Sequence, residues 1–357
     1  MRNWKDRCAR ALPWVVLVAL LVIAASVGCR APTRAPESAA PETELSRAQG
    51  LASGLAQPTA LVSAFHYPKG ATNGVVYSGE NWIGWTRAGL ITNYAPQRAL
   101  TIERCTIDGT ALPGQGWGIR AYDCIDWTIA RCRFANILGA RDDTSDGVPD
   151  RYLGEHAIYI NVAGNVSIVG CSFNWIAAQA IQTVFVGRVN ESSDYAGFLN
   201  AGGTISVRNC DAYNCGLANP NHSAGGRASF AFSFFPSSQS VEVMGCEIEN
   251  VGNPWWAVNP ANPASPRFNS YGGILIDSHP SATVRGTTVH LDNPDRGLLD
   301  VRNCDVVEVV NCTFDANGRS QVRVAGCRAV KVSGCKGNAT LWVDGVVVGP
   351  VANGYVR

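Results

Sequence analysis

Apolar and polar residues alternate in short stretches from about residue 100 onward, and a period of two is typical of β-strands. The stretches recur around a column of small residues, with apolar positions five and three before it and usually two after it. The column consists of Cys105, Cys132, Cys171, Cys210, Cys246, Thr287, Cys312 and Cys335. Asn or Gly usually stands directly before the column, for example Asn209 and Gly286. A tight bend at each column position is therefore expected.

A second alternating stretch begins thirteen residues before most column members. It includes Ile119/Ala121, Ile158/Ile160, Ile274/Ile276, Leu299/Val301 and Val322/Val324. The intervals between column members are 27, 39, 39, 36, 41, 25 and 23 residues. Each repeat thus carries at least two short strands separated by corners, and stacking the repeats would bury one continuous core. We predict an all-β solenoid of about 8–10 coils over residues 59–345.

This repeat resembles that of the right-handed parallel β-helix family, which has the pectate-lyase-like fold. The resemblance covers most of the chain after residue 58 and rests on the column of eight coils. It implies long parallel sheets wound into a right-handed solenoid. The fold hosts lyases, hydrolases, epimerases, phage fibres and adhesins, so it does not specify an activity. Many of its enzymes bind a polysaccharide on one sheet, which implies a glycan partner.

The end of the repeat has its own signal. Leu341–Val348 indicates a hairpin around Asp344 and Gly345, a pair that suits a tight two-residue turn. We expect residues 346–357 to cap the solenoid, because an uncovered sheet edge promotes aggregation.

The first 29 residues are typical of an export signal. Four cations precede an apolar run over residues 11–27, which is short for a membrane span. Ser26-Val27-Gly28-Cys29 resembles a bacterial lipoprotein box, which implies a lipid on Cys29 and a membrane anchor. A cleaved signal and an uncleaved anchor are the alternatives. Residues 30–58 are rich in Ala, Pro, Glu and Ser and suit a flexible tether. We therefore predict an exported protein, either a membrane-anchored lipoprotein or a periplasmic or extracellular one.

Charge is low and balanced, with 29 Lys and Arg against 28 Asp and Glu. This balance argues against a nucleic-acid partner. We also expect the protein to be a monomer. Thirteen cysteines in an exported chain suggest a disulfide framework. The alternative, which we favour, is a stack of buried reduced thiols, because side chains at a parallel corner rarely meet the disulfide dihedral.

Four consecutive coils carry insertions, over residues 139–155, 187–203, 214–228 and 252–271. Stacked insertions wall off a groove. Beside the groove one strand begins in successive coils at His156, Gln179, Arg227 and Gly272. We expect an outward polar strip of His156, Tyr159, Gln179, Gln182 and Arg227, continued by Arg120, Asp277, Asp300, Arg302 and Arg323.

A polysaccharide lyase needs a base beside a uronate carboxylate and a cation to neutralise it. His156 or Tyr159 could be the base, and Arg120 or Arg227 the cation. A hydrolase needs paired carboxylates, for which Asp277 and Asp300 are the best candidates. The alternative is an ordinary solvated sheet with ladder salt bridges, Asp277 to Arg302 and Asp300 to Arg323.

Two further segments suggest binding. Asp142, Thr144, Asp146, Val148 and Asp150 follow the spacing of a calcium loop with Gly147 at its sixth position, and an acidic surface turn is the alternative. Trp255 and Trp256 lie in an Asn- and Pro-rich stretch, where they would either stack on sugars or enter the core.

Together these features favour an extracytoplasmic protein that recognises a polysaccharide, and cleaves or modifies it in one version of the hypothesis. The alternative is a non-catalytic surface or envelope scaffold or an adhesion protein. Whether the chain is an enzyme stays open. If it is one, a lyase is favoured over a glycoside hydrolase.

Overall fold

The computed structural model describes residues 74–357 except for some internal segments. These exceptions are residues 84–88, 94–96, 110–116, 138–139, 142–150, 153–155, 163, 177, 185–202, 217–228, 237, 250, 252–270, 293–296 and 318–319. The predicted export signal, the Cys29 lipid site and the tether over 30–58 lie outside the described residues.

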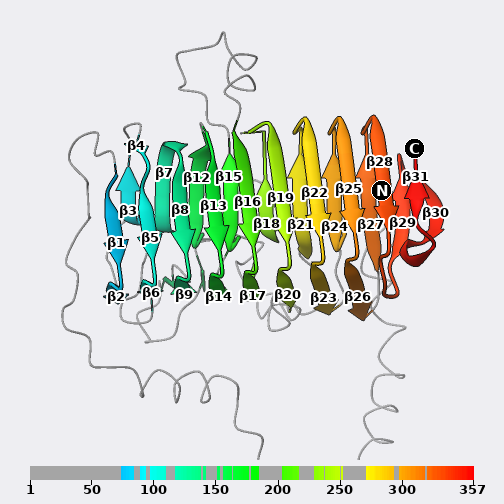
Figure 1. The fold of residues 1–357 in the computed structure, drawn as a ribbon. Coiled ribbons are helices and arrows are strands. Elements are labelled where there is room, and N and C mark those ends of the chain that lie inside the picture. The colour runs from blue at the N-terminus through cyan, green and yellow to red at the C-terminus, as the bar shows by residue number, and fades with distance from the viewer. Residues whose placement is uncertain are drawn as a thin grey trace, which may run out of the picture. The chain divides into compact units, whose positions relative to one another are not determined.

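Each complete coil contributes one strand to each of three sheets, and the next complete coil repeats the order (Figure 1). The coil that begins at residue 158 consists of β12 (Ile158–Val162), β13 (Val166–Val169) and β14 (Ser172–Ile176). Each of these strands pairs in parallel with its equivalents in the coils before and after it. The described chain is thus an all-β parallel β-helix, as the repeat predicts.

The strands of the three sheets, called A, B and C, follow in stacking order. Sheet A contains β3 (Gly89–Asn93), β7 (Trp117–Ile125), β12, β15 (Ile181–Val184), β18 (Ser229–Phe234), β21 (Tyr271–Asp277), β24 (Leu299–Arg302), β27 (Gln321–Ala325), β29 (Thr340–Val343) and β30 (Val346–Pro350), with β4 (Gln97–Arg98) beside β7. Sheet B contains β1 (Val76–Ser78), β5 (Thr101–Glu103), β8 (Trp127–Ala130), β13, β16 (Thr204–Arg208), β19 (Ser240–Met244), β22 (Ser281–Arg285), β25 (Val306–Val310), β28 (Ala329–Ser333) and β31 (Tyr355–Val356). Sheet C contains β2 (Asn81–Ile83), β6 (Thr106–Asp108), β9 (Arg133–Ile137), β14, β17 (Asp211–Cys215), β20 (Glu247–Glu249), β23 (Thr288–Asp292) and β26 (Thr313–Asn317).

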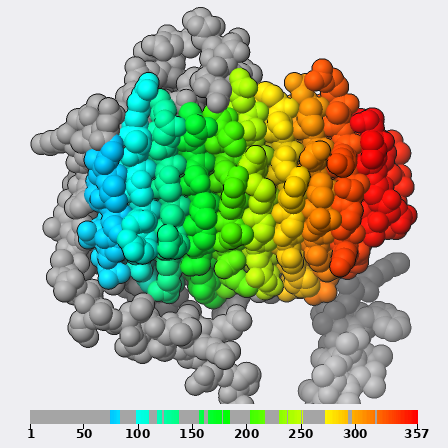
Figure 2. Space-filling model, viewed as in Figure 1, coloured from blue at the N-terminus to red at the C-terminus, as the bar shows by residue number. Residues whose placement is uncertain are grey.

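One continuous core fills the space between the sheets, and the coils follow one another as successive bands of colour in Figure 2. Alternate residues of each strand point into it, so Ile158 and Ile160 are fully buried. Like side chains stack from coil to coil, as in the pair Phe134 and Phe173, whose ring centroids lie 5.0 Å apart. Stacking of equivalent residues makes each coil a template for the next.

The corner between sheets B and C is identical in length throughout the described coils. Two residues separate the strands each time, as Gly170 and Cys171 separate β13 from β14. The first of the two always has a positive φ, for example 61° at Gly170 and 51° at Asn209. A left-handed residue turns the chain sharply, which is why glycine and asparagine dominate the position.

The column residue is the second residue of that corner, and its side chain stabilises the bend. The thiol of Cys210 donates a hydrogen bond to the carbonyl oxygen of Arg208 at 3.3 Å, and the hydroxyl of Thr287 donates equivalently to Arg285 at 3.2 Å. All eleven cysteines among the described residues are buried and free. The favoured interpretation of stacked reduced thiols is therefore confirmed for the described part of the chain.

The C-terminal hairpin is also confirmed. β29 and β30 pair antiparallel around Asp344 and Gly345, whose φ values of 48° and 80° form the tight turn. The chain then passes through a short 3-10 helix, η3 (Val351–Asn353), and β31 pairs antiparallel with β28. Val351 is fully buried, so this segment closes the core at that end.

The predicted register is wrong in one coil. Phe232, rather than Ser229, pairs with Ile181, and Phe230 therefore takes the place expected for Arg227. The next coil has glycine at this position, because a Cβ on Gly272 would lie 2.2 Å from Cε1 of the Phe230 ring. Packing of this aromatic ring sets the register, and Arg227 lies outside the described residues.

Candidate functional site

One row of side chains crosses the outer face of sheet A, on the side opposite the core. Its members, in stacking order, are Arg120, Tyr159, Gln182, Ser233, Leu275, Asp300, Arg323 and Trp342. The predicted outward position of Tyr159, Gln182, Arg120 and Asp300 is therefore correct. The middle of the row is not a solvated surface, however, because Ser233, Leu275 and Asp300 are buried.

Aromatic and polar side chains gather at the N-terminal end of this row. The rings of Trp117 and Tyr159 stack with centroids 5.7 Å apart and planes inclined by 23°. The guanidinium carbon of Arg120 lies 3.8 Å from the centroid of the Trp117 ring, a cation–π contact. The His156 ring is 5.3 Å from that of Tyr159. We call Trp117, Arg120, His156, Tyr159 and Gln182 the aromatic strip.

Trp117 is the member that the sequence interpretation missed. It stands two residues before Ile119, as His156 stands two before Ile158. A comparison of these matching positions in adjacent coils would have found it. Its neighbour Gly118 has no room for a side chain, because a Cβ there would lie 2.6 Å from the carbonyl oxygen of Ala157. The backbone of β7 can therefore approach β12 closely beside the two stacked rings.

The predicted outward position does not hold for Gln179, and His156 is only partly exposed. Both residues stand just before their strands, β12 and β15, which begin at Ile158 and Ile181. Gln179 is only 8% exposed, and Nδ1 of His156 is buried without a hydrogen-bond partner. Burial lowers the pKa of His156 to about 3. Its imidazole is neutral at physiological pH and is a weak base.

Asp277 and Asp300 on sheet A do not form the predicted ladder salt bridges. Asp277 and Arg302 are register partners, as are Asp300 and Arg323. Arg302, however, binds Asp300 of its own strand with both Nε and Nη2, the first at 2.9 Å. The hydrogen bond to Asp300 raises the pKa of Arg302. Arg323 bonds instead to Gln321.

Asp277 is held by neutral donors. Its Oδ1 accepts hydrogen bonds from Ser278 Oγ at 2.8 Å and Asn303 Nδ2 at 3.1 Å. Asp277 and Asp300 are therefore both engaged by protein groups, and Asp300 is 2% exposed. This arrangement positions the two carboxylates structurally and gives neither an evident role as a free acid or base.

Several candidate residues lie outside the described part of the chain. They are Arg227, Trp255, Trp256 and the calcium set Asp142, Thr144, Asp146, Val148 and Asp150. The strands that flank the calcium segment, β10 (Ala140–Arg141) and β11 (Arg151–Tyr152), pair antiparallel. The described residues themselves contain no group of three or more His, Cys, Asp or Glu that could hold a metal ion.

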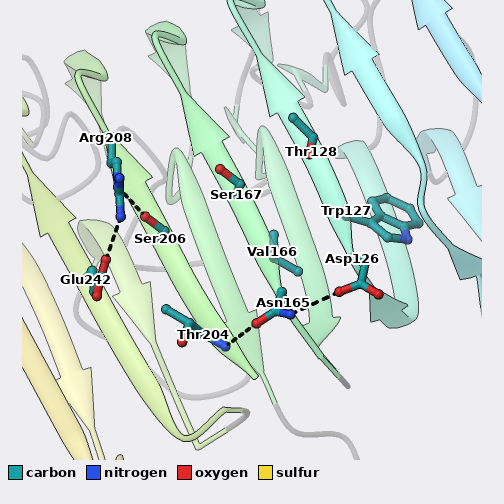
Figure 3. Close-up of a pocket in the computed structure, with 10 residues that line it drawn as sticks. All are labelled: Asp126, Trp127, Thr128, Asn165, Val166, Ser167, Thr204, Ser206, Arg208 and Glu242. Atoms are coloured by element: carbon teal, nitrogen blue, oxygen red, sulfur yellow. Dashed lines mark hydrogen bonds and ion pairs between the residues drawn. The ribbon is translucent and has the colours of Figure 1, made fainter. Parts of the chain in front are cut away.

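A polar hollow lies on the outer face of sheet B, a second place that the sequence interpretation missed (Figure 3). Its volume is about 410 Å³. It is lined by Asp126, Trp127, Thr128, Asn165, Val166, Ser167, Thr204, Ser206, Arg208 and Glu242. The sequence signal was the position four before the cysteine column, where Thr101, Thr128, Ser167 and Ser206 follow one another.

Among the described residues, no helix is long and apolar enough to cross a membrane. In comparisons with known proteins, a family model described as "Right handed beta helix region" matches residues 88–336, which is more than half of the chain. Neither the curated proteins nor the solved structures gave a match.

Proposed function

Because the chain belongs to the right-handed β-helix family, a fold compatible with polysaccharide-related and scaffold roles, we propose that it binds a polysaccharide on the outer face of sheet A. The observation that carries the proposal is the stacked pair Trp117 and Tyr159 with Arg120 against it. Aromatic rings pack on the apolar faces of sugars, and polar side chains beside them bond the hydroxyls.

The composition of the aromatic strip suits a glycan better than an apolar ligand. Arg120 and Gln182 stand on either side of Tyr159 in adjacent strands, as its direct register partners. Consecutive strands lie about 4.8 Å apart, so the three side chains span roughly 10 Å along the solenoid. A sugar chain that follows the solenoid axis would meet all three.

Binding by the full chain to soluble neutral and uronate-containing polysaccharides, measured by calorimetry, tests the proposal. We expect Trp117→Ala and Tyr159→Ala to weaken binding about tenfold or more each, because either change removes a stacking surface. Tyr213→Ala is the matched control, since Tyr213 is a partly exposed tyrosine on the outer face of sheet C. Equal affinity in all three variants would contradict the site.

Cleavage is a second candidate function, and the pairing of Tyr159 with Arg120 is the observation that favours it. Removal of the proton beside a uronate carboxylate needs a base next to a cation, and these side chains are adjacent. His156 is the weaker base candidate because its pKa is about 3. New ultraviolet absorbance on a uronate polymer, lost in Tyr159→Phe, would support a lyase. Binding without any shortening of the polymer would favour a non-catalytic scaffold or adhesion protein.

Two further proposals concern segments that the structure does not describe. We propose calcium binding at Asp142–Asp150, which predicts a rise in melting temperature with calcium that Asp146→Ala removes. We also propose export and anchoring through a lipid on Cys29. That predicts that the full chain associates with membranes and that Cys29→Ser abolishes the association. An unaltered full chain found only in the soluble fraction would rule the anchor out.

A further inference from the structure

The hollow on sheet B has a floor of short hydroxyl side chains. Thr128, Ser167 and Ser206 are register partners on β8, β13 and β16 and point away from the core. On the outer face Ser167 lies between Asn165 and Val169, and Ser206 lies between Thr204 and Arg208, so these short side chains form the floor of the hollow (Figure 3). The hydroxyls of Thr128 and Ser167 have no hydrogen-bond partner among the described residues.

One wall of the hollow is a fixed chain of hydrogen bonds. Asn165 donates from Nδ2 to Asp126 at 3.0 Å and accepts at Oδ1 from the backbone N–H of Thr204 at 3.1 Å. The hydroxyl of Thr204 bonds to that of Ser240 at 2.7 Å. Because Asn165 is held from both sides, the wall keeps its shape without a ligand.

The far end is closed by an ion pair. Arg208 donates from Nε to Ser206 at 2.7 Å and from Nη2 to Glu242 at 2.9 Å. The side chains of Arg208 and Glu242 are 50% and 34% exposed, so both still face solvent. A guanidinium carries more N–H donors than the two used here, and the carboxylate has a second oxygen. The pair therefore offers donors and acceptors side by side with no net charge.

These features point to one kind of ligand. An anion would meet two carboxylates, Asp126 and Glu242, while Arg208 is already paired with Glu242; a neutral polyhydroxylated chain can donate to the carboxylates and accept from the guanidinium. The floor hydroxyls repeat about every 4.8 Å, and successive sugars of an extended chain would place hydroxyls along such a row. We propose that this hollow is a binding site for a neutral oligosaccharide that lies across β8, β13 and β16.

This site is separate from the aromatic strip and does not rest on it. The strip is on sheet A and the hollow on sheet B, with the corner at Asp126 between β7 and β8. The recognition chemistry also differs, because the hollow uses hydroxyls and a charge-neutral ion pair where the strip uses stacked rings. Two such sites would let one chain bind a glycan at two places. Loss of binding at one site can be measured independently of the other.

A filling substitution with an in-row control tests the proposal. In the full chain, Ser167→Tyr fills the hollow, while Thr283→Tyr adds the same side chain to the same row on β22, beyond Glu242. The probes are neutral hexasaccharides of glucose, mannose and N-acetylglucosamine, with hexagalacturonate as the anionic comparison. Calorimetry gives the affinity, and hydrogen exchange locates the protected strands.

We expect at least one neutral hexasaccharide to bind and to slow exchange in β8, β13 and β16. Ser167→Tyr should weaken this binding about tenfold or more, and Thr283→Tyr less than about twofold. Arg208→Leu should weaken it as well, whereas Arg285→Leu, which alters another Arg–Glu pair of this face, should not. Trp117→Ala should leave it unchanged.

Three results would overturn the proposal. The first is that no neutral hexasaccharide binds the full chain. The second is binding that Ser167→Tyr leaves intact and Trp117→Ala removes, which would assign all glycan binding to sheet A. The third is that hexagalacturonate binds more tightly than every neutral sugar and slows exchange in β8, β13 and β16. That result would show that the site prefers an anionic ligand.

Discussion

His279 is buried and His156 is partly buried, and each has a buried ring nitrogen that lacks a partner. Nδ1 of His279 donates to the Ser238 carbonyl oxygen at 3.1 Å, while its Nε2 is unpaired. Burial lowers the pKa of both imidazoles, to about 3 for His156. Each is therefore neutral in the folded chain at pH 7, and protonation of His156 would place a charge on a ring whose Nδ1 is buried without a hydrogen-bond partner.

This burial predicts a loss of stability in acid. The unfolded chain binds a proton on His156 near pH 6.5, about the ordinary value, whereas the folded chain does so only near pH 3. The contribution of neutral His156 is thus complete above about pH 6.5 and is lost progressively as the pH falls towards 3. We expect His156→Gln to reduce the difference in urea midpoint between about pH 7.5 and pH 5.

His290→Gln is the control for that measurement, since His290 is a partly exposed histidine on β23. The same reduction in both variants would mean that burial of His156 does not cause the pH dependence.

For individual side chains, the sequence predicted some directions relative to the core and missed others. Tyr159 was placed correctly because it alternates with two core isoleucines. Gln179 was misplaced because it precedes β15, where alternation along the strand does not determine the direction of a side chain. The pairing of Arg302 with Asp300 depends on a choice of rotamers between two nearby carboxylates, which register alone does not determine.

The two-residue corner between sheets B and C is the element that sets the repeat. Its first residue is left-handed in every described coil, even where it is Arg104 or Arg131. The cysteine column could be predicted because the corner imposes its chemistry on the sequence. The register of β18 could not, because Phe232 stands fourteen residues before Cys246, whereas Ile158 stands thirteen before Cys171.

Substitution of Gly286 measures the free-energy cost of the left-handed backbone at this corner. Its φ is 56°, and no heavy atom lies within 4 Å of the position of an added Cβ, so a substitution meets strain without a clash. We expect Gly286→Ala to reduce the free energy of unfolding by about 1 kcal/mol. Gly286→Asn should cost less, because Asn209 and Asn311 occupy the equivalent corners at 51° and 53°. Urea unfolding measures both, and a larger cost for asparagine would contradict the conformational explanation.

For the whole molecule, the repeat predicted the architecture because every coil carries the same signal. The repeat did not predict the candidate sites. The insertions carry no repeat, and the hollow on sheet B arises only when short side chains of three coils, far apart in sequence, come together. The stacked rings of Trp117 and Tyr159 also come from separate coils. A site that depends on lateral neighbours needs the register before it can be found.

The C-terminal hairpin should determine whether the solenoid associates. Deletion of residues 345–357 removes β30 and β31 and leaves the edges of β29 and β28 unpaired. Because open edges pair with other chains, we expect larger species that increase with concentration, measured by light scattering.

The control for this deletion is Val347→Thr with Val348→Thr. It changes two valines that are 52% and 43% exposed and keeps the hairpin hydrogen bonds. An unchanged size after the deletion would show that the hairpin does not protect the edge.

The constant corner between sheets B and C also has a consequence for the surface of the molecule. The other two connections differ in length from coil to coil, from one residue between β7 and β8 to 21 between β20 and β21. A gain or loss of residues in them leaves the left-handed turn and the thiol bend intact. Length changes at the borders of sheet A can therefore alter the surface that the molecule presents, while the corner between sheets B and C keeps its two-residue geometry.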